Sequence, residues 1–389
     1  MITRNLYLQV RKNLKTFPAV AILGPRQVGK TTLVKKISST IKREKLYLDL
    51  EKDKDIRKLA DEPEDFLSHY VNDTVIIDEI QRMPRLFVLL RPLIDEKRRA
   101  ARYIVTGSAS PELMKGASES LAGRISYMYL YPINLTELPA KLTIHHHWMR
   151  GGFPTALTMR SAAMAHNWMS DFITTYIERD LPFLFDIRFS AQVMKKLWSM
   201  MAHWHGNLIN LEKFSDSLNV SATTVSRYFD FLEGAFIIHR LPPFFINSKK
   251  RILKTPKLFI LDSGILHNLL SIDNFKELAG HPAIGASWEG YVMSQVYYCK
   301  SQKLSMYFYR THDGAECDLV LVKGHVVKCC AEIKYSKAPN ISRGFYESMK
   351  SLKCSAGYVI CQTDMVYRNK QGVTFIDLKS FLVNVLPNL

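Results

Sequence analysis

Short apolar runs alternate with helical stretches in the first third of the chain. Residues 18–23, 74–77 and 102–106 are each long enough for one buried strand. The run Leu33–Ile37 follows the first strand with the spacing of a helix. Alternating strands and helices predict an α/β fold built on a parallel sheet, which binds its ligand at the carboxyl ends of the strands.

The middle of the chain shows helical periodicity instead. Residues 160–205 read as amphipathic helices, whereas residues 138–150, with Pro139 and three adjacent histidines, predict a polar connector. Residues 207–240 predict a winged helix-turn-helix, in which Asn210 and Ser221 begin two successive helices. The outward positions of the second helix are Thr223, Thr224 and Arg227. A basic stretch suits the wing: Lys249, Lys250, Arg251, Lys254 and Lys257.

The pattern changes again after residue 258. A helix over 287–300 precedes apolar strands at 306–310, 317–321 and 326–333, which indicates a second α/β unit. We therefore expect three domains: an α/β core over 1–137, a helical and winged-helix domain over 138–257, and a C-terminal α/β domain over 258–389.

Composition adds a strong positive charge. The 389 residues carry 53 basic and 36 acidic side chains, a formal charge of +17, which favours a nucleic acid partner, with DNA as the expectation. A merely basic surface is the alternative. No apolar run approaches the ~20 residues of a membrane span. The N-terminus lacks an apolar signal core and the six cysteines show no CxxC spacing, so we expect a cytoplasmic protein with free thiols.

A phosphate-binding motif follows the first strand. Gly24–Thr31 matches GxxxxGK[ST] without a mismatch. The glycines allow a tight turn that aims backbone N–H groups at phosphate oxygens. Lys30 is expected on the β- and γ-phosphates, and the Thr31 hydroxyl on Mg²⁺. The predicted nucleotide contacts are Gly24, Pro25, Arg26, Gln27, Val28, Gly29, Lys30, Thr31, Thr32 and Asp78.

The second predicted strand ends in two acids. Asp78 is expected to hold Mg²⁺ through water, and Glu79 to orient or deprotonate the attacking water. The third strand, over 102–106, is expected between the first two. Thr106 and Ser108 are both candidates for sensing the γ-phosphate, and the residues leave that choice open. The pattern predicts an ATPase that uses ATP and Mg²⁺.

These motifs resemble one known family. The run Leu23–Thr32 is similar to the AAA+-type ATPases that carry a C-terminal domain of unknown function, DUF4143. The same family's later motifs are matched, in order, by residues 77–84, 106–110, 121–124, 151–154 and 176–181. In this resemblance Arg124 lies where an arginine reaches a nucleotide, its own or a neighbour's. Pairing with a surface acid is the alternative, and Arg26, Arg82 and Arg85 are weaker candidates.

The last domain contains a D–ExK pattern. In a strand Glu332 and Lys334 lie on the same face, and Asp318 on the neighbouring antiparallel strand can face them. This resembles the PD-(D/E)XK nuclease fold, which implies a Mg²⁺ site with Glu289 as a helix-borne ligand and Glu316 as a weaker candidate. A surface ion cluster is the alternative.

Three functions are compatible with these patterns. The first is an ATPase whose nucleotide cycle drives a DNA-associated module. The second is an ATP-regulated, metal-dependent nuclease. The third is a non-enzymatic scaffold or regulator, in a homo-oligomer or with a protein client, that uses ATP occupancy as a switch.

Overall fold

The chain divides into two compact units. The computed structural model describes residues 2–108, 121–185, 189–245 and 254–389. Unit 1 comprises Met1–Ile133, Glu178–Arg188 and Gly234–Phe236, and unit 2 comprises Asn134–Ile177, Phe189–Glu233 and Ile237–Leu389. The chain thus leaves unit 1 and returns to it twice, so residues far apart in the sequence contribute to the same unit. Part of the predicted basic wing, Lys249–Arg251, lies outside the described residues, as does Ser110.

Unit 1 is built on a parallel sheet with the strand order β2-β3-β4-β1-β5. Its strands are β1 (Ala19–Leu23), β2 (Lys45–Asp49), β3 (Thr74–Asp78), β4 (Tyr103–Gly107) and β5 (Ile125–Tyr129). All residues of β1, β3 and β4 are buried, as expected for apolar strands covered on both faces. The expected position of β4, between β1 and β3, is confirmed.

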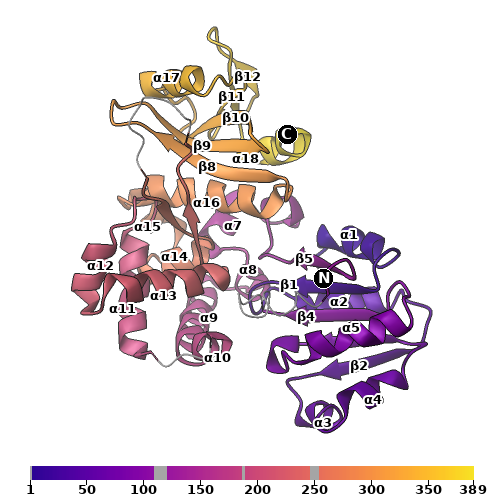
Figure 1. Ribbon diagram of the computed structural model, residues 1–389. Helices are drawn as coiled ribbons and strands as arrows, with labels where there is room; N and C mark the ends of the chain where they lie inside the picture. The colour runs from indigo at the N-terminus through magenta and orange to yellow at the C-terminus, as the bar shows by residue number, and fades with distance from the viewer. Residues whose placement is uncertain (1, 109–120, 186–188, 246–253) are drawn as a thin grey trace. The chain divides into compact units, whose positions relative to one another are not determined.

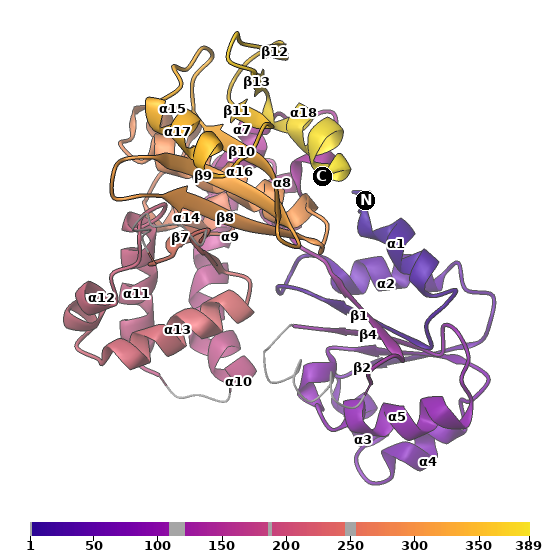
Figure 2. The same cartoon turned by 45° about the horizontal axis from the view of Figure 1, so that its top comes forward.

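Helices cover both faces of this sheet (Figures 1 and 2). One face carries α1 (Leu6–Asn13) and α2 (Lys30–Ser38), and the other carries α3 (Asp53–Arg57), α4 (Pro63–Ser68) and α5 (Leu86–Glu96). Leu90 and Ile94 of α5 share a buried cluster with alternate residues of β1, β3 and β4. This packing leaves the carboxyl ends of the strands for the loops that follow them, including the 3-10 turn η1 (Ile80–Arg82).

Unit 2 begins with helices. These are η2 (Leu135–Glu137), α7 (Ile144–Arg150), α8 (Pro154–Thr158), α9 (Ala162–Thr175), α11 (Ala191–His203), α12 (Leu211–Leu218), α13 (Ala222–Gly234), α14 (Ser263–Leu269) and α15 (Phe275–Gly280). Between α9 and α11 the chain enters unit 1 through η3 (Tyr176–Asp180) and α10 (Leu181–Phe185). Two antiparallel strands, β6 (Ile238–Leu241) and β7 (Lys257–Ile260), follow α13.

A six-stranded mixed sheet forms the remainder of unit 2, in the order β12-β13-β11-β10-β9-β8. Its elements are β8 (Leu304–Arg310), β9 (Glu316–Lys323), β10 (Val326–Ile333), β11 (Gly357–Ile360), β12 (Tyr367–Arg368) and β13 (Val373–Ile376), with α16 (Ile284–Cys299), α17 (Arg343–Ser351), α18 (Leu378–Ser380), η4 (Phe381–Val385) and η5 (Leu386–Asn388). The antiparallel pairing of β9 and β10 agrees with the sequence-based expectation, and β8 pairs antiparallel with β9.

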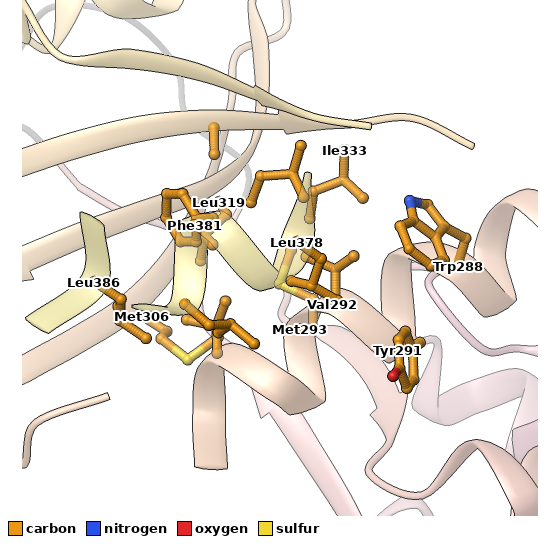
Figure 3. Close-up of a cluster of buried hydrophobic side chains, with 14 of the residues drawn as sticks. Trp288, Tyr291, Val292, Met293, Met306, Leu319, Ile333, Leu378, Phe381 and Leu386 are labelled. Carbon is orange, nitrogen blue, oxygen red and sulfur yellow. The ribbon is translucent and has the colours of Figure 1, made fainter. Parts of the chain in front are cut away.

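A large buried cluster lies between this sheet and α16. Val292 and Met293 of α16 face Leu319 and Ile333 of the strands, and Phe381 packs beside them (Figure 3). On the opposite face, α17 contributes Phe345 to a separate cluster with strand residues. The sheet is therefore buried on both sides, which explains why its central strands are almost continuously apolar.

The prediction of a polar connector at residues 138–150 is wrong. These residues include helix α7, whose His147 and Trp148 are fully buried. Trp148 Nε1 donates to Ser287 Oγ over 3.0 Å, and Ser287 Oγ lies 2.7 Å from His267 Nε2. Hydrogen bonds satisfy these polar atoms inside the core, so the histidine-rich composition did not indicate exposure.

All six cysteines are free, and five of them are buried. Within the described ranges, no helix combines the length and the apolar character required to cross a bilayer.

Acid is expected to destabilise unit 2 through His267. Burial lowers the pKa of His267 from 6.5 to about 4. Between these values the unfolded chain binds the proton and the folded protein does not, so the free energy of unfolding should fall as pH decreases from 6.5 to 4. The loss for this group is about 3 kcal/mol. His267→Gln keeps a donor and an acceptor without titrating.

Urea unfolding at pH 7, 5.5 and 4.5 measures this difference. The gap in unfolding free energy between wild type and His267→Gln should narrow as the pH falls. His203→Gln, at an exposed position of α11, is the matched control and should leave the wild-type pH dependence unchanged. A constant gap at all three pH values would contradict the assignment.

Candidate functional site

The loop after β1 has a backbone that requires glycine. Gly24 has a φ of 153°, and a Cβ built there would lie 2.1 Å from the carbonyl oxygen of Leu130. Gly29 has a φ of 95° and directly precedes α2. Between them Gln27 also adopts a positive φ of 61°. The loop therefore curves tightly around the start of α2, where free N–H groups and the positive end of the helix dipole favour phosphate.

Lys30 is buried in this loop, where two backbone carbonyls accept from its ammonium. Its Nζ donates to the carbonyl oxygens of Gly24 and Pro25 over 3.1 and 2.9 Å, and Glu79 Oε1 lies 3.9 Å away. Burial lowers the pKa of Lys30, while the carboxylates of Glu79 and Asp78 act in the opposite direction. A desolvated ammonium held by two carbonyls is suited to pairing with an incoming phosphate.

Asp78 is the centre of a hydroxyl network at the end of β3. Its Oδ2 accepts from Thr31 Oγ1 over 2.8 Å and from Tyr47 OH over 2.5 Å, and its Oδ1 accepts from Thr106 Oγ1. The structure thus brings Thr31 and Asp78 together, as the motif predicts. A carboxylate beside a threonine hydroxyl offers the hard oxygen ligands that Mg²⁺ prefers.

Glu79 is fixed in an unusual backbone conformation beside this network. It has a φ of 60° and its N–H donates to Thr106 Oγ1 over 3.1 Å. Gln81 Nε2 donates to Glu79 Oε2, and Gln81 Oε1 accepts from the N–H of Ser108 over 3.2 Å. Left-handed backbone at a non-glycine residue is common where a side chain must be aimed at a ligand.

The two sensor candidates differ in their contacts. Thr106 bridges Asp78 and Glu79, so it links the two acids. Ser108 Oγ is buried and has no hydrogen-bond partner among the described residues. An unpaired buried hydroxyl next to a phosphate loop is available to a ligand oxygen. Both observations fit a bound nucleotide with its Mg²⁺, for which Thr31 and Asp78 would be the protein ligands.

The remaining loop residues differ in exposure. Val28 is buried and its carbonyl oxygen accepts from Arg4 Nη1 over 2.8 Å, whereas Gln27 and Thr32 are exposed. Arg26 is mostly buried and pairs with Asp180, and its other nitrogen lies 3.2 Å from Glu51 Oε1. The loop is therefore tied to a residue 154 positions away along the chain.

Arg124 does not lie at the phosphate loop. Its Nε and Nη2 donate to the two carboxylate oxygens of Asp95 on α5, over 2.6 and 2.7 Å. This bidentate contact lowers the pKa of Asp95. Within one chain the structure therefore shows the surface-acid alternative, and a role toward a neighbour's nucleotide stays a prediction. Of the weaker candidates, Arg82 lies 3.5 Å from Glu51, and Arg85 donates to the carbonyl oxygens of Leu59 and Ala60.

The predicted acidic residues of unit 2 are also brought together, but lysines pair with them. Lys334 Nζ lies 2.9 Å from Glu332 Oε1, and Lys257 Nζ lies 3.2 Å from Glu289 Oε1. Asp318 Oδ2 accepts from the N–H of Ile333 over 2.9 Å. Within the described ranges, no group of three or more His, Cys, Asp or Glu side chains is arranged to hold a metal ion.

Sequence reasoning missed three residues of the unit 1 site: Tyr47, Gln81 and Asp180. Tyr47 belongs to β2, which mixes charged and apolar residues and gave no strand signal. Gln81 and Asp180 lie inside motifs that the chain shares with the family, and their place in these motifs is the signal that could have identified them as site residues. Their roles depend on tertiary contacts with Glu79 and Arg26.

Comparison with known proteins agrees with this geometry. Residues 16–139 match the family described as an AAA domain, residues 284–381 match DUF4143, and residues 141–276 match DUF8612, both of these being domains of unknown function. An uncharacterised protein of Mycobacterium tuberculosis is 38% identical over 351 residues, covering 90% of this chain and 78% of the relative. The chain belongs to the AAA+-type P-loop ATPases that carry a DUF4143 domain.

More distant similarities extend beyond mycobacteria. This AAA+ ATPase is 24% identical over 299 residues to an uncharacterised protein of Haemophilus influenzae, covering 68% of this chain and 72% of the relative. Among solved structures, a Walker-type ATPase of Pyrococcus abyssi aligns with 69% of this chain and 96% of its own, at 13% identity and a TM-score of 0.47. The AAA-type fold and the geometry of the loop support ATP binding and hydrolysis by unit 1.

Proposed function

We propose that this AAA+ ATPase is a cytoplasmic enzyme that hydrolyses ATP with Mg²⁺ and couples the nucleotide cycle to a DNA-associated module. The observation that carries the proposal is the gathering of Lys30, Thr31, Asp78 and Glu79 at the ends of β1 and β3. The loop from Gly24 to Thr31 binds the phosphates through backbone N–H groups, and Lys30 balances their charge.

Glu79 holds the attacking water in this scheme. Its carboxylate is oriented by Gln81, and its backbone is held by Thr106. A carboxylate in this position accepts a hydrogen bond from water and directs the lone pair of the water toward the γ-phosphate. Mg²⁺ held by Thr31 and Asp78 would neutralise charge on the phosphate oxygens.

Arg26 supports coupling to the rest of the chain. It belongs to the phosphate loop, yet it pairs with Asp180, which lies at the end of η3 where the chain arrives from α9. A bound nucleotide offers Arg26 a stronger anion than Asp180. Arg26 would then exchange partners, and the segment that carries Asp180 would be released or repositioned. The ion pair is thus a candidate relay between nucleotide state and the helices of unit 2.

The helices α12 and α13 support a DNA contact in the manner of a winged helix. Asn210 and Ser221 cap the two helices as expected, since their side chains accept from the N–H groups of Lys213 and Thr224. Thr223 and Arg227 of α13 are exposed, where a recognition helix meets a groove. The excess positive charge favours the same partner.

One part of the predicted wing is wrong. Lys257 is buried in β7 and paired with Glu289, so it does not contact phosphates from a wing. The sequence pattern counted it with neighbouring basic residues because it lies close to them in the chain. The positive surface for DNA therefore rests on other residues.

The test is ATP hydrolysis measured with and without duplex DNA, alongside nicking of the same labelled duplex. We expect hydrolysis that requires Mg²⁺ and increases with DNA, DNA affinity that falls steeply with salt, and no nicking. Hydrolysis that ignores DNA would favour the scaffold or regulator and contradict the DNA-associated module. Absence of hydrolysis under all conditions would contradict the enzyme.

The relay is tested in the same assay with Asp180→Asn, which removes the charge that holds Arg26. DNA should no longer stimulate hydrolysis, while basal hydrolysis should remain within about threefold of wild type, because no group that touches phosphate is changed. Asp171→Asn, at an exposed position of α9, is the matched control. Normal stimulation in Asp180→Asn would remove the proposed relay but leave the ATPase assignment intact.

A further inference from the structure

Unit 2 contains four carboxylates that influence one another electrostatically. Glu289 is on α16, Glu316 and Asp318 are on β9, and Glu332 is on β10. Burial raises the pKa of Glu289, Asp318 and Glu332, and neighbouring carboxylates of the cluster act in the same direction. In the fold that the D–ExK pattern resembles, acids placed in this way hold a divalent cation.

An ammonium group occupies part of this cluster. Lys257 reaches it from β7, and its Nζ lies 3.2 Å from Glu289 Oε1 and 3.5 Å from Glu316 Oε1. The Lys257 side chain is only 7% exposed. Its Nζ also lies over the ring of Phe308, 5.5 Å from the ring centroid. The lysine is therefore an internal part of the site and not a mobile surface cation.

Lys257 competes with a metal ion for these acids. Glu289 and Glu316 each direct an oxygen at its ammonium, and Asp318 Oδ2 accepts the N–H of Ile333. The absence of a metal-competent group among the described residues agrees with these contacts. Mg²⁺ takes carboxylate oxygens together with water in near-octahedral geometry, and the Lys257 ammonium takes up an oxygen of both Glu289 and Glu316.

We propose that the ammonium of Lys257 takes the place of a divalent cation, so that the acidic site of the DUF4143-containing unit is a metal-free structural centre. The site retains the acidic residues of a metal-dependent nuclease, and the Lys257 ammonium pairs with two of them where a metal ion would otherwise bind. It follows that the wild-type protein does not cleave nucleic acid there, and that the ATPase unit carries the catalytic activity of the chain. The inference stands on unit 2 alone and does not depend on the function proposed for unit 1.

The charge of Lys257 is held inside the cluster. Its ammonium is buried and lies 3.2 Å from Glu289 Oε1 and 3.5 Å from Glu316 Oε1. Removing the lysine charge would leave the buried carboxylates without enough positive charge to offset them. A divalent cation can supply that charge.

Lys334 does not perform the same function. Its side chain is 43% exposed, and its Nζ lies 2.9 Å from Oε1 of Glu332, two residues earlier in the chain. This is the lysine that the ExK pattern already contains, and in the resembled fold it coexists with a metal. Lys257 is not part of the D–ExK pattern and lies on a different strand. It is therefore a feature of this site that the pattern by itself does not contain.

The experiment counts bound Mn²⁺ by electron paramagnetic resonance in nucleotide-free, full-length protein. Lys257→Met removes the charge and keeps the bulk. It should gain a site that binds Mn²⁺ at least about tenfold more tightly than wild type. Lys254→Met, at an exposed position three residues earlier, is the matched control and should gain none. Adding Glu332→Gln to Lys257→Met should abolish the gained site, which separates it from any metal at the phosphate loop.

Two results would overturn the proposal. One is a folded Lys257→Met protein whose Mn²⁺ binding equals that of wild type. The other is a wild-type protein that binds a Mn²⁺ ion that the single variant Glu332→Gln does not bind, because the site would then already be open. The comparison of wild type with Glu332→Gln needs no change at Lys257, so it tests the proposal even if Lys257→Met fails to fold. The double variant Lys257→Met/Glu289→Gln removes both members of the ion pair and should fold without metal.

Discussion

Replacing Glu79 by glutamine should reduce ATP hydrolysis by roughly 10²- to 10³-fold while ATP binding is retained. The amide keeps the size of the side chain but cannot accept a proton from water. Gln81 donates to Glu79 Oε2 and the N–H of Glu79 donates to Thr106, and both contacts can persist in the variant. The loss therefore falls on turnover and not on the fold of the site.

The measurement is phosphate release at saturating ATP, together with equilibrium binding of a fluorescent ATP analogue. Glu96→Gln, which changes an exposed carboxylate at the end of α5, is the matched control and should hydrolyse ATP at the wild-type rate. Wild-type turnover in Glu79→Gln would exclude Glu79 as the residue that orients or deprotonates water. Equal loss of binding and turnover would instead assign Glu79 a structural role in the loop.

Replacing Lys30 by methionine should weaken ATP binding by about 100-fold. Hydrogen bonds between charged groups contribute roughly 3 kcal/mol at the upper end, and among the described residues the carboxylate of Glu79 lies 3.9 Å from the ammonium. The same change should not lower the free energy of unfolding in the absence of nucleotide. Burial lowers the pKa of Lys30, which shows that its charge is held at a cost in the free protein.

Calorimetric titration with ATP–Mg²⁺ and urea unfolding without nucleotide separate these two effects. Lys36→Met, later in the same helix, is the matched control because Lys36 packs on the ring of Tyr7 and not in the loop. The combination expected for Lys30→Met is weak binding with undiminished stability. A large fall in unfolding free energy would mean that Lys30 chiefly supports the loop, through its bonds to Gly24 and Pro25.

The ion pair of Arg26 with Asp180 changes how the shared family motifs are understood. Sequence similarity placed both residues in family motifs, with Arg26 as a predicted nucleotide contact and no role for Asp180. The structure joins them, so the phosphate loop and the end of η3 belong to one site. Motifs at 151–154 have a different explanation. Asp262 accepts from the N–H of Gly152 over 2.8 Å, and a Cβ at Gly151 would lie 2.0 Å from its carboxylate.

Local chemistry made the ATPase core predictable. The turn of the phosphate loop, the strand before it and the acids at the end of β3 depend on contiguous residues, whose conformational needs can be read from their types. The same holds for the caps of α12 and α13 and for the antiparallel strands β9 and β10. Each of these features is specified by contacts within a few residues or by a simple alternation.

Partner choice was decided only by the tertiary structure. Arg26 faces Asp180 and Lys257 faces Glu289, although both were predicted to face phosphate, and Arg124 takes the surface acid Asp95, which was the alternative to a nucleotide. The sequence indicates that a charge is present but not which distant acid the fold brings to it. Long-range pairing depends on how strands and helices pack, and a buried charge takes the partner that offsets its loss of hydration.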